Sequence, residues 1–257
     1  MDLGIKGEIA LVLGGTQGLA WGCAQALADA GARVILNGRN AERGQTAVSQ
    51  LAGSTFAQGD IGDARARQAL VERVLAIGQP SIIVTNAGGP PASPFEETKL
   101  DDWRHSYETN VLGPLEIVRA LLPGMRERGY GRIINITSFV VKELYPNMAL
   151  SNSLRIGLTG AMGSLAREVA AAGITVNGLL PGLMDTGALQ RVIDDRVRRQ
   201  GQSEQAVRKA MAESIPMQRL GTAKDFGALC AFLASRHAAY ITGQNICVDG
   251  GLTKSSI

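Results

Sequence analysis

The chain has 257 residues, of which 45% are hydrophobic and 19% are charged, a composition that excludes a disordered or collagen-like protein. Its formal net charge is only +3 and its basic residues are scattered, so we expect no nucleic-acid partner. Three cysteines without C-x-x-C spacing argue against a disulfide framework or a thiolate metal site and favour a reducing compartment.

The sequence shows no pattern typical of a membrane segment or a secretion signal. The first residues, Met1 to Glu8, lack an apolar core, and no later run approaches 18 apolar residues. We therefore expect a cytoplasmic protein with no membrane partner. The two histidines, His105 and His237, lie far apart and lack ligand spacing, so we expect no metal site.

Short runs rich in β-branched residues alternate with Ala- and Leu-rich runs of helical spacing along the whole chain. The predicted strands are 9–13, 34–36, 54–58, 82–85, 133–137, 174–180 and 245–248. The predicted helices are 18–30, 41–51, 64–77, 114–128, 152–171 and 223–235. Continuously apolar strands suit a sheet covered on both faces. The pattern predicts a single α/β domain over 1–257, with a Rossmann-type, doubly wound, seven-stranded parallel sheet.

A glycine-rich loop follows the first strand and leads into the first helix. Glycines let the backbone turn tightly and approach a pyrophosphate, whose charge is met by free N–H groups at the helix N-terminus. A merely tight turn is the alternative, but the place of the loop in the pattern favours a dinucleotide site. The residues expected to contact the cofactor are Gly14, Thr16, Gln17, Gly18 and Leu19.

The second strand is followed by Arg39. NAD sites usually have an acidic residue here that binds the ribose 2′-hydroxyl, whereas an arginine suits a 2′-phosphate. Arg39 therefore predicts NADP(H) as the cofactor. The alternative is a solvent-exposed arginine near a helix start.

Two stretches interrupt the alternation of strands and helices. The first, 89–94, is rich in proline, and the second, 187–216, is long, polar and charged. Ligands of such sheets bind beyond the carboxyl ends of the strands, and both stretches should overhang that crevice. We interpret 187–216 as a substrate loop or lid, with a plain surface excursion as the alternative.

Several motifs resemble those of the short-chain dehydrogenase/reductase family, and the likeness extends from about Gly7 to Gly251. They are the glycine loop, the Asn86-Ala87-Gly88 turn and the closing segments 242–244 and 249–251. The resemblance implies that Asn110 and Ser138 belong to an active site. It also implies that Asp60 and Ile61 border the adenine and that Pro181, Gly182 and Thr186 lie beside the nicotinamide. The turn residues Asn86, Ala87 and Gly88 are expected to bind the cofactor as well.

The sequence departs from the family pattern at the reaction centre. The family has a tyrosine thirteen residues after its serine and a lysine four residues further on, but counting from Ser138 gives Ser151 and Arg155. In the family the tyrosine protonates a carbonyl oxygen, and the lysine lowers its pKa and holds the nicotinamide ribose. We expect Ser151 to orient a carbonyl or a water. Arg155 should hold ribose hydroxyls without releasing a proton.

A reductase of this kind would need another proton source. Lys142, four residues past Ser138, is our first candidate for a general acid, and an ordinary surface lysine is the alternative. Tyr145 is the second candidate and a water is the third. Because Pro114 lacks an N–H, the helix should kink there and leave the carbonyl of Asn110 free to hold that water.

The sequence thus predicts an NADPH-dependent oxidoreductase that reduces the carbonyl, or an activated double bond, of a small organic substrate. The alternative is a catalytically weak NADP(H)-binding sensor or scaffold protein. Gly157, Gly160 and Gly163 each cost a helix roughly 1 kcal/mol relative to alanine. We interpret them as the close approach of helices in a homo-oligomer, because the resemblance implies a dimer or homotetramer; close packing on the sheet is the alternative.

Overall fold

Seven parallel strands form one sheet in the computed structural model, which describes residues 1–255. The strands, in chain order, are β1 (Ile9–Val12), β2 (Arg33–Gly38), β3 (Thr55–Gln58), β4 (Ile82–Thr85), β5 (Gly131–Ile136), β6 (Ile174–Pro181) and β7 (Asn245–Val248). Their order in the sheet is β3-β2-β1-β4-β5-β6-β7. The order reverses between β1 and β4, and a doubly wound sheet binds ligands at this switch point. The predicted fold class is confirmed.

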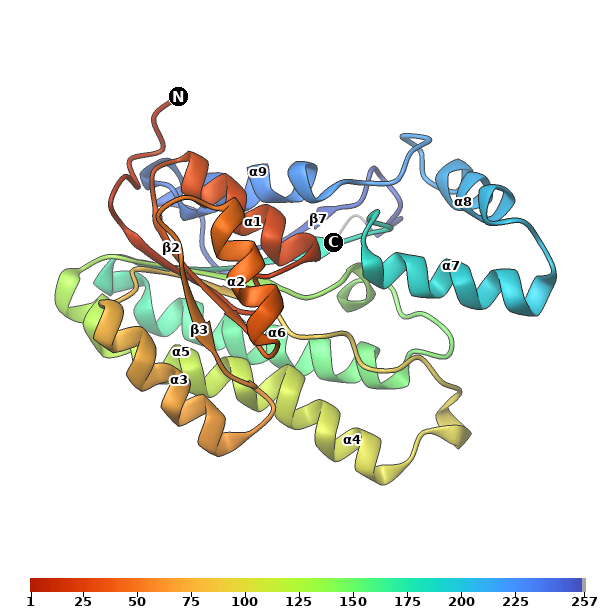
Figure 1. Cartoon of the computed structure of the whole chain (residues 1–257), viewed down its shortest axis with the longest axis horizontal. Helices are drawn as coiled ribbons and strands as arrows, with labels where there is room; N and C mark the ends of the chain where they lie inside the picture. Colours follow the sequence, from red (N-terminus) through yellow and green to blue (C-terminus); the bar gives the residue numbers. More distant parts are fainter. Residues whose placement is uncertain (256–257) are drawn as a thin grey trace.

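Helices cover both faces of the sheet (Figure 1). One face carries α1 (Gly18–Asp29), α2 (Ala41–Gln50) and α9 (Ala223–Ala234), and the other carries α3 (Ala64–Ile77), α5 (Gly113–Arg128) and α6 (Ala149–Val169). Alternate residues of β1 and of the position after it pack into the two hydrophobic cores, one on each face of the sheet. Ala10 and Val12 lie in one core, and Leu11 and Leu13 in the other. Burial on both sides explains why the strands are continuously apolar.

Two glycines bring α1 and α9 together back to back. A Cβ atom at Gly22 would collide with the carbonyl oxygen of Ala223, and one at Gly227 would collide with the carbonyl oxygen of Gly22. Only glycine allows backbones to approach this closely. The helix that follows the glycine loop is therefore fixed from behind by a second helix.

The helix before α5 is irregular. After α4 (Leu100–Tyr107), a single π-helical turn spans Glu108–Leu112 and leads directly into α5. Pro114 has no N–H to bond the carbonyl of Asn110, so the regular α-helical ladder breaks there. The predicted irregularity is confirmed, in the form of a widened turn that holds Asn110 against the sheet.

The stretch 187–216 is mostly helical, and its charged run 191–199 lies on a helix. It contains α7 (Gly187–Gln200) and α8 (Glu204–Glu213), which pack around Leu189, Ile193, Val207 and Met211. Arg208 ties the two helices to the strand end, because it bonds Glu204, Gln190 and Asp185. The pair lies at one end of the molecule, beside the carboxyl ends of the strands (Figure 1).

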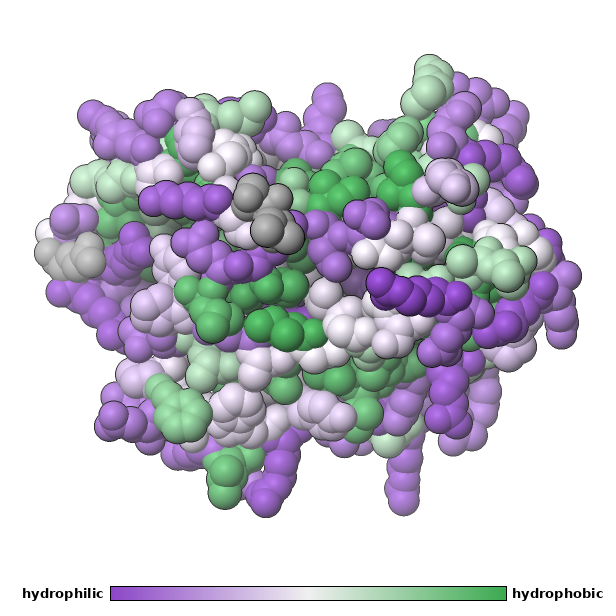
Figure 2. All heavy atoms as spheres, turned by 180° about the vertical axis from the view of Figure 1, so that it is seen from behind, coloured by the Kyte–Doolittle hydropathy of each residue, from purple (hydrophilic) through white to green (hydrophobic). Residues whose placement is uncertain are grey.

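Among the helices of residues 1–255, none is long and apolar enough to cross a bilayer. Figure 2 shows the face opposite to that of Figure 1, with apolar side chains gathered near its middle and polar ones around them.

Candidate active site

The glycine loop forms a cradle at the end of β1. Gly14 and Gly18 have φ angles of +60° and +63°. A Cβ at Gly14 would lie 2.7 Å from Nδ2 of Asn86, whereas one at Gly18 would meet nothing within 4 Å. Gln17, the N-cap residue of α1, makes no side-chain capping bond, so the first N–H groups of the helix have no side-chain acceptor. The cradle therefore fits a pyrophosphate.

Asn37 supports this loop from below and is absent from our sequence-based site. Its side chain is 2% exposed. Oδ1 accepts from the N–H of Gly14 at 3.4 Å, and Nδ2 donates to the carbonyls of Ala57 and Gly59, each at 3.1 Å. A lone amide inside an apolar strand was the signal that could have found it, since buried polar groups require partners.

Two arginines flank the cradle at the end of β2. Arg39 is 74% exposed and lies 3.8 Å from Asp60. Arg43, which the sequence analysis missed, donates from Nη1 to Oε1 of Gln17 at 2.9 Å. The sequence signal that could have identified Arg43 was its spacing of four residues from Arg39. Together they put two cations beside the cradle, where a Cβ at Gly38 would lie 3.0 Å from Cγ2 of Thr16.

The end of β3 places Asp60 and Ile61 beside Arg39. Oδ1 of Asp60 accepts from the N–H of Gly62 at 2.9 Å, and the carbonyl of Ile61 accepts from Nη1 of Arg67 at 2.9 Å. Arg67 is in turn paired with Glu116 at 2.6 Å and Glu108 at 3.2 Å. This network, in which the arginine is buried and both glutamates are partly exposed, fixes the loop that the resemblance assigns to the adenine.

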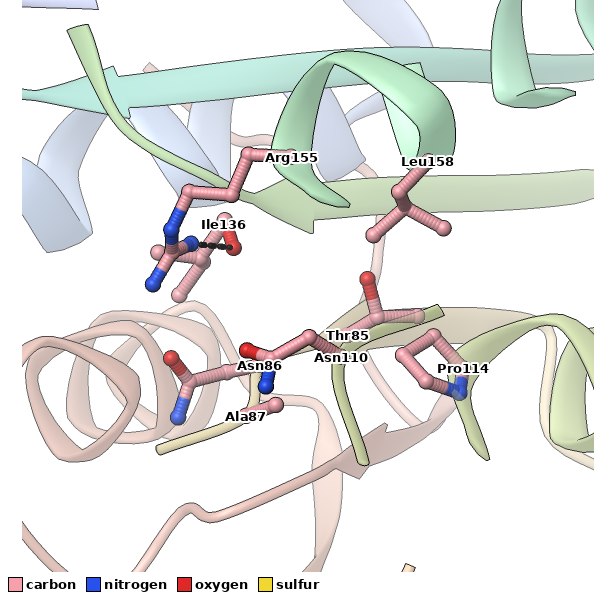
Figure 3. A pocket seen from close by; sticks show the side chains of 8 residues that line it. All are labelled: Thr85, Asn86, Ala87, Asn110, Pro114, Ile136, Arg155 and Leu158. Atoms are coloured by element: carbon pink, nitrogen blue, oxygen red, sulfur yellow. Dashed lines mark hydrogen bonds between the residues drawn. The ribbon is translucent and has the colours of Figure 1, made fainter. Parts of the chain in front are cut away.

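Arg155 reaches from α6 across the end of β5. Its Nη1 donates to the carbonyl of Thr137 at 2.6 Å and lies 3.5 Å from that of Ile136, and its Nε donates to Oγ of Ser151 at 3.2 Å. Figure 3 shows the guanidinium turned toward Ile136, above Asn86 and Asn110. These side chains line a small hollow, together with Thr85, Ala87, Pro114 and Leu158.

No carboxylate within residues 1–255 pairs with Arg155, in contrast to Arg67 with its two glutamates. Burial without a counter-charge lowers the pKa of the Arg155 guanidinium to about 10. The group remains a cation at neutral pH. A desolvated cation bonded only to carbonyls and a hydroxyl favours further oxygen ligands that carry partial or full negative charge.

The two serines are arranged as hydrogen-bond donors. Ser151 is buried, and its oxygen accepts from Arg155. Ser138 caps a short 3₁₀ turn, Phe139–Val141, and its oxygen accepts from the N–H of Val140 at 3.4 Å. A hydroxyl whose oxygen accepts a bond directs its own hydrogen elsewhere. Both hydroxyls can therefore donate to an electron-rich oxygen.

Lys142 ends the same 3₁₀ turn and is half-buried. Four residues of a 3₁₀ turn rise about 8 Å, so Lys142 lies near Ser138 along the loop. No contact joins its ammonium to the serines or to Arg155 in the described residues, and no carboxylate pairs with it there. Its assignment as the proton source stays a prediction.

Asn110 lines the hollow with Arg155 and is 5% exposed. Its Nδ2 donates to the carbonyl of Ser106 at 3.1 Å, which fixes the amide inside the π-helical turn. The predicted water on this residue stays a prediction, although the hollow beside it has polar walls.

The remaining predicted residues lie at the end of β6 or follow strands β1, β4 and β6 in the chain. Gly182 donates its N–H to the carbonyl of Val248 at 3.1 Å, next to Pro181 at the end of β6, and Thr186 is the N-cap residue of α7. Leu19 packs on one core and Ala87 on the other, and a Cβ at Gly88 would meet nothing within 4 Å. No three His, Cys, Asp or Glu side chains of the described residues gather as metal ligands.

Known proteins resemble this chain over nearly its whole length. The family model described as enoyl-(acyl carrier protein) reductase matches residues 14–253. The NADPH-dependent reductase BacG of Bacillus subtilis is 28% identical, covering 96% of this chain and 98% of BacG. The 3-oxoacyl-[acyl-carrier-protein] reductase FabG of Escherichia coli is 33% identical, covering 97% and 99%. L-sorbose reductase from Gluconobacter frateurii, solved with NADPH and L-sorbose, superposes with a TM-score of 0.94 at 28% identity, covering 99% of this chain and all of the other.

Proposed function

The chain belongs to the short-chain dehydrogenase/reductase family, and from this membership and the site geometry we propose that it is an NADPH-dependent reductase of small carbonyl compounds. The observation that carries the proposal is the bond between Arg155 and Ser151 beside the glycine cradle. It joins a cation that has no carboxylate partner within residues 1–255 to a donor hydroxyl, at the two positions that the family pattern gives to its lysine and tyrosine. The named activities of BacG, FabG and L-sorbose reductase support the reaction class.

We assign the binding of NADP(H) to the residues around the cradle. Gly14, Thr16, Gln17, Gly18 and Leu19 would hold the pyrophosphate, and Arg39, assisted by Arg43, the 2′-phosphate. Asp60 and Ile61 would border the adenine. Asn86, Ala87, Gly88, Pro181, Gly182 and Thr186 would border the nicotinamide half, whose ribose hydroxyls Arg155 would bind. When bound, NADPH supplies the hydride for the reduction.

The chain's own groups would stabilise the charge that develops on the substrate oxygen. Ser138 and Ser151 donate hydrogen bonds to this oxygen, and Arg155 strengthens the donation from Ser151 by polarising its hydroxyl. A preorganised donor is typically worth about 10²–10³ in turnover. An activated double bond conjugated to a carbonyl would use the same oxygen site.

We propose Lys142 as the group that delivers the proton to this oxygen, since it shares the short turn of Ser138 and can be reprotonated from solvent. Tyr145 and a water beside Asn110 are the alternatives. Lys142→Met keeps the length of the side chain and removes the ammonium. We expect it to lower kcat about 10²-fold with unchanged NADPH affinity; unchanged turnover would transfer the role to one of the alternatives.

The helix pair α7 and α8 is proposed as the lid of the substrate crevice, and the outer face of α6 as a subunit interface of a homo-oligomer. A Cβ at Gly157, Gly160 or Gly163 would meet nothing within 4 Å, so packing within the chain does not require these glycines. Gly160→Leu should therefore dissociate the oligomer in analytical ultracentrifugation. In a chain that is monomeric, the same change would instead stabilise α6 by up to about 1 kcal/mol.

The function is tested by following NADPH oxidation with a panel of ketones, enones and acyl thioesters. We expect turnover of at least one ketone, and a loss of about 10²-fold in Ser138→Ala. Ser153→Ala is the matched control, because its hydroxyl bonds only carbonyls of its own helix. Tight NADPH binding without turnover of any compound would favour the sensor or scaffold alternative.

A further inference from the structure

The segment from Ser138 to Ser151 carries the proposed proton donor and both donor hydroxyls, yet it contains little regular structure. Beyond the 3₁₀ turn Phe139–Val141 and the start of α6, its backbone follows bends and turns, and much of it is exposed. Backbone in such a segment is held by side-chain bonds or it samples many shapes. The question is which side chains hold it.

Asn152, on the first turn of α6, binds both backbone groups of one residue in the segment. Its Nδ2 donates to the carbonyl of Tyr145 at 2.9 Å, and its Oδ1 accepts from the N–H of Tyr145 at 3.4 Å. Only a carboxamide can donate and accept in this way. The two bonds close a loop of eight residues on the helix that also carries Ser151 and Arg155.

The ring of Tyr145 is fixed from the other end of the segment. Phe139 follows Ser138 directly, and its ring meets that of Tyr145 edge to face, with centroids 5.6 Å apart and planes at 82°. Tyr145 is thus held by a neighbour of Ser151 on one side and a neighbour of Ser138 on the other. The position of Tyr145 therefore depends on the distance between the two serines.

The phenol of Tyr145 is exposed on the loop between Ser138 and Ser151. The side chain is 47% exposed, and its hydroxyl has no hydrogen-bond partner within residues 1–255. Neighbouring loops meet this segment on both sides: Met148 pairs with Ser93 of the stretch after β4, and Glu143 accepts from the N–H of Lys254 at 3.5 Å. The exposed hydroxyl therefore belongs to a loop that also contacts the chain after β4 and the C-terminal residues.

We propose that Asn152 is a positioning residue that holds Tyr145 at the crevice mouth, where the phenol selects carbonyl compounds bearing a second polar group, a hydroxyl or oxo substituent. The inference rests on the proposed reductase function. A phenol offers one donor and one acceptor, and a site that bonds a substrate hydroxyl discriminates strongly against analogues lacking it. Tyr145 acts on recognition, and Asn152 acts only through Tyr145.

The first test follows amide hydrogen exchange of the Tyr145 N–H in the whole protein, with or without turnover. Asn152→Ala should lower its protection at least about tenfold, since the Oδ1 acceptor is lost. Ser153→Ala, on the same turn, should leave it unchanged. NADPH affinity should stay constant in both variants. Unchanged protection in Asn152→Ala would overturn the proposal, whether or not the protein proves to be a reductase.

The second test compares kcat/KM for hydroxyacetone and butanone, a matched pair with and without the hydroxyl. Wild type should prefer hydroxyacetone about tenfold or more, and Tyr145→Phe should lose the preference. Asn152→Ala and Tyr145→Ala should each lower kcat/KM for hydroxyacetone about tenfold, and the double variant no further than either. The proposal would be overturned if the two losses in kcat/KM multiplied in the double variant. It would also be overturned if Tyr145→Phe kept the preference for hydroxyacetone over butanone. Absence of turnover of both ketones in wild type would instead count against the reductase function.

Discussion

The glycine cradle follows β1 and the Ser138–Arg155 segment follows β5, the two strands on either side of β4, but they are held in different ways. In the cradle, position is set by backbone: Gly14 and Gly18 have left-handed φ angles, and α1 is fixed by glycine contacts with α9. In the segment, position is set by side-chain bonds from Arg155 and Asn152. A change of side chain can therefore alter the chemistry of the segment while the cradle keeps its shape.

The largest effect should come from adding one methyl group to the cradle. In Gly14→Ala, the Cβ would lie 2.7 Å from Nδ2 of Asn86 at a φ of +60°. We expect the Kd for NADPH to rise at least about 100-fold, near 3 kcal/mol, in isothermal titration calorimetry. Gly53→Ala is the control, because its φ is +74° and nothing lies within 4 Å. It should cost about 1–2 kcal/mol of stability and no affinity. Equal binding losses in both would mean that strain alone, and not the cradle, is being measured.

Removing the charge of Arg155 should change activity and stability in opposite directions, with a lower kcat/KM and a higher free energy of unfolding. We expect Arg155→Met to lower kcat/KM for a reduced ketone about 100-fold, because Ser151 loses its polarising partner. The free energy of unfolding should rise by about 1 kcal/mol, since a desolvated charge without a counter-ion is removed. The sign follows from the pKa: the folded value of about 10 lies below the ordinary one, so the charge destabilises the fold below pH 10. Urea unfolding at pH 7 measures the gain, and a loss of stability would contradict this account.

Cofactor choice should depend on the exposed arginine beside the cradle. Arg39→Ala should lower the ratio of NADPH to NADH affinity about tenfold or more, because the 2′-phosphate loses a charged ligand. Arg33→Ala, at the opposite end of β2, is the control and should leave the ratio unchanged. An unchanged ratio in Arg39→Ala would assign the phosphate to Arg43.

The smallest effect should appear in the helix that supports the cradle from behind. Arg219, together with the backbone and side chain of Thr222, holds the pKa of Asp225 well below its usual range at the start of α9. A lowered folded pKa stabilises the fold above the unfolded value, near 4, and the contribution is lost as pH falls. Asp225→Asn should cost about 1 kcal/mol at pH 7, allowing for solvent screening, and less toward pH 3. Asp101→Asn, in an exposed pair with Arg104, should show little change at either pH.

The same contrast explains what the sequence could predict. Glycines and apolar runs constrain the backbone locally, so the seven strands, the cradle and the break at Pro114 follow from the printed residues. Asn37 and Arg43 escaped prediction because their partners, Ala57 and Gln17, lie far away in the chain. The two bonds of Asn152 also depend on a fold of the loop that no period or motif encodes. The charged run 191–199 of α7 is typical of a solvated helix face, and Leu189 and Ile193 of the same helix have helical spacing.

The helix pair α7 and α8 buries its apolar side chains mainly within its own small cluster, and Arg208 fastens it at the strand end through Asp185. Such a unit is an exchangeable module. Grafting the corresponding residues from another reductase would replace the proposed lid without disturbing the nucleotide half, which makes this pair the natural place to begin redesigning substrate choice.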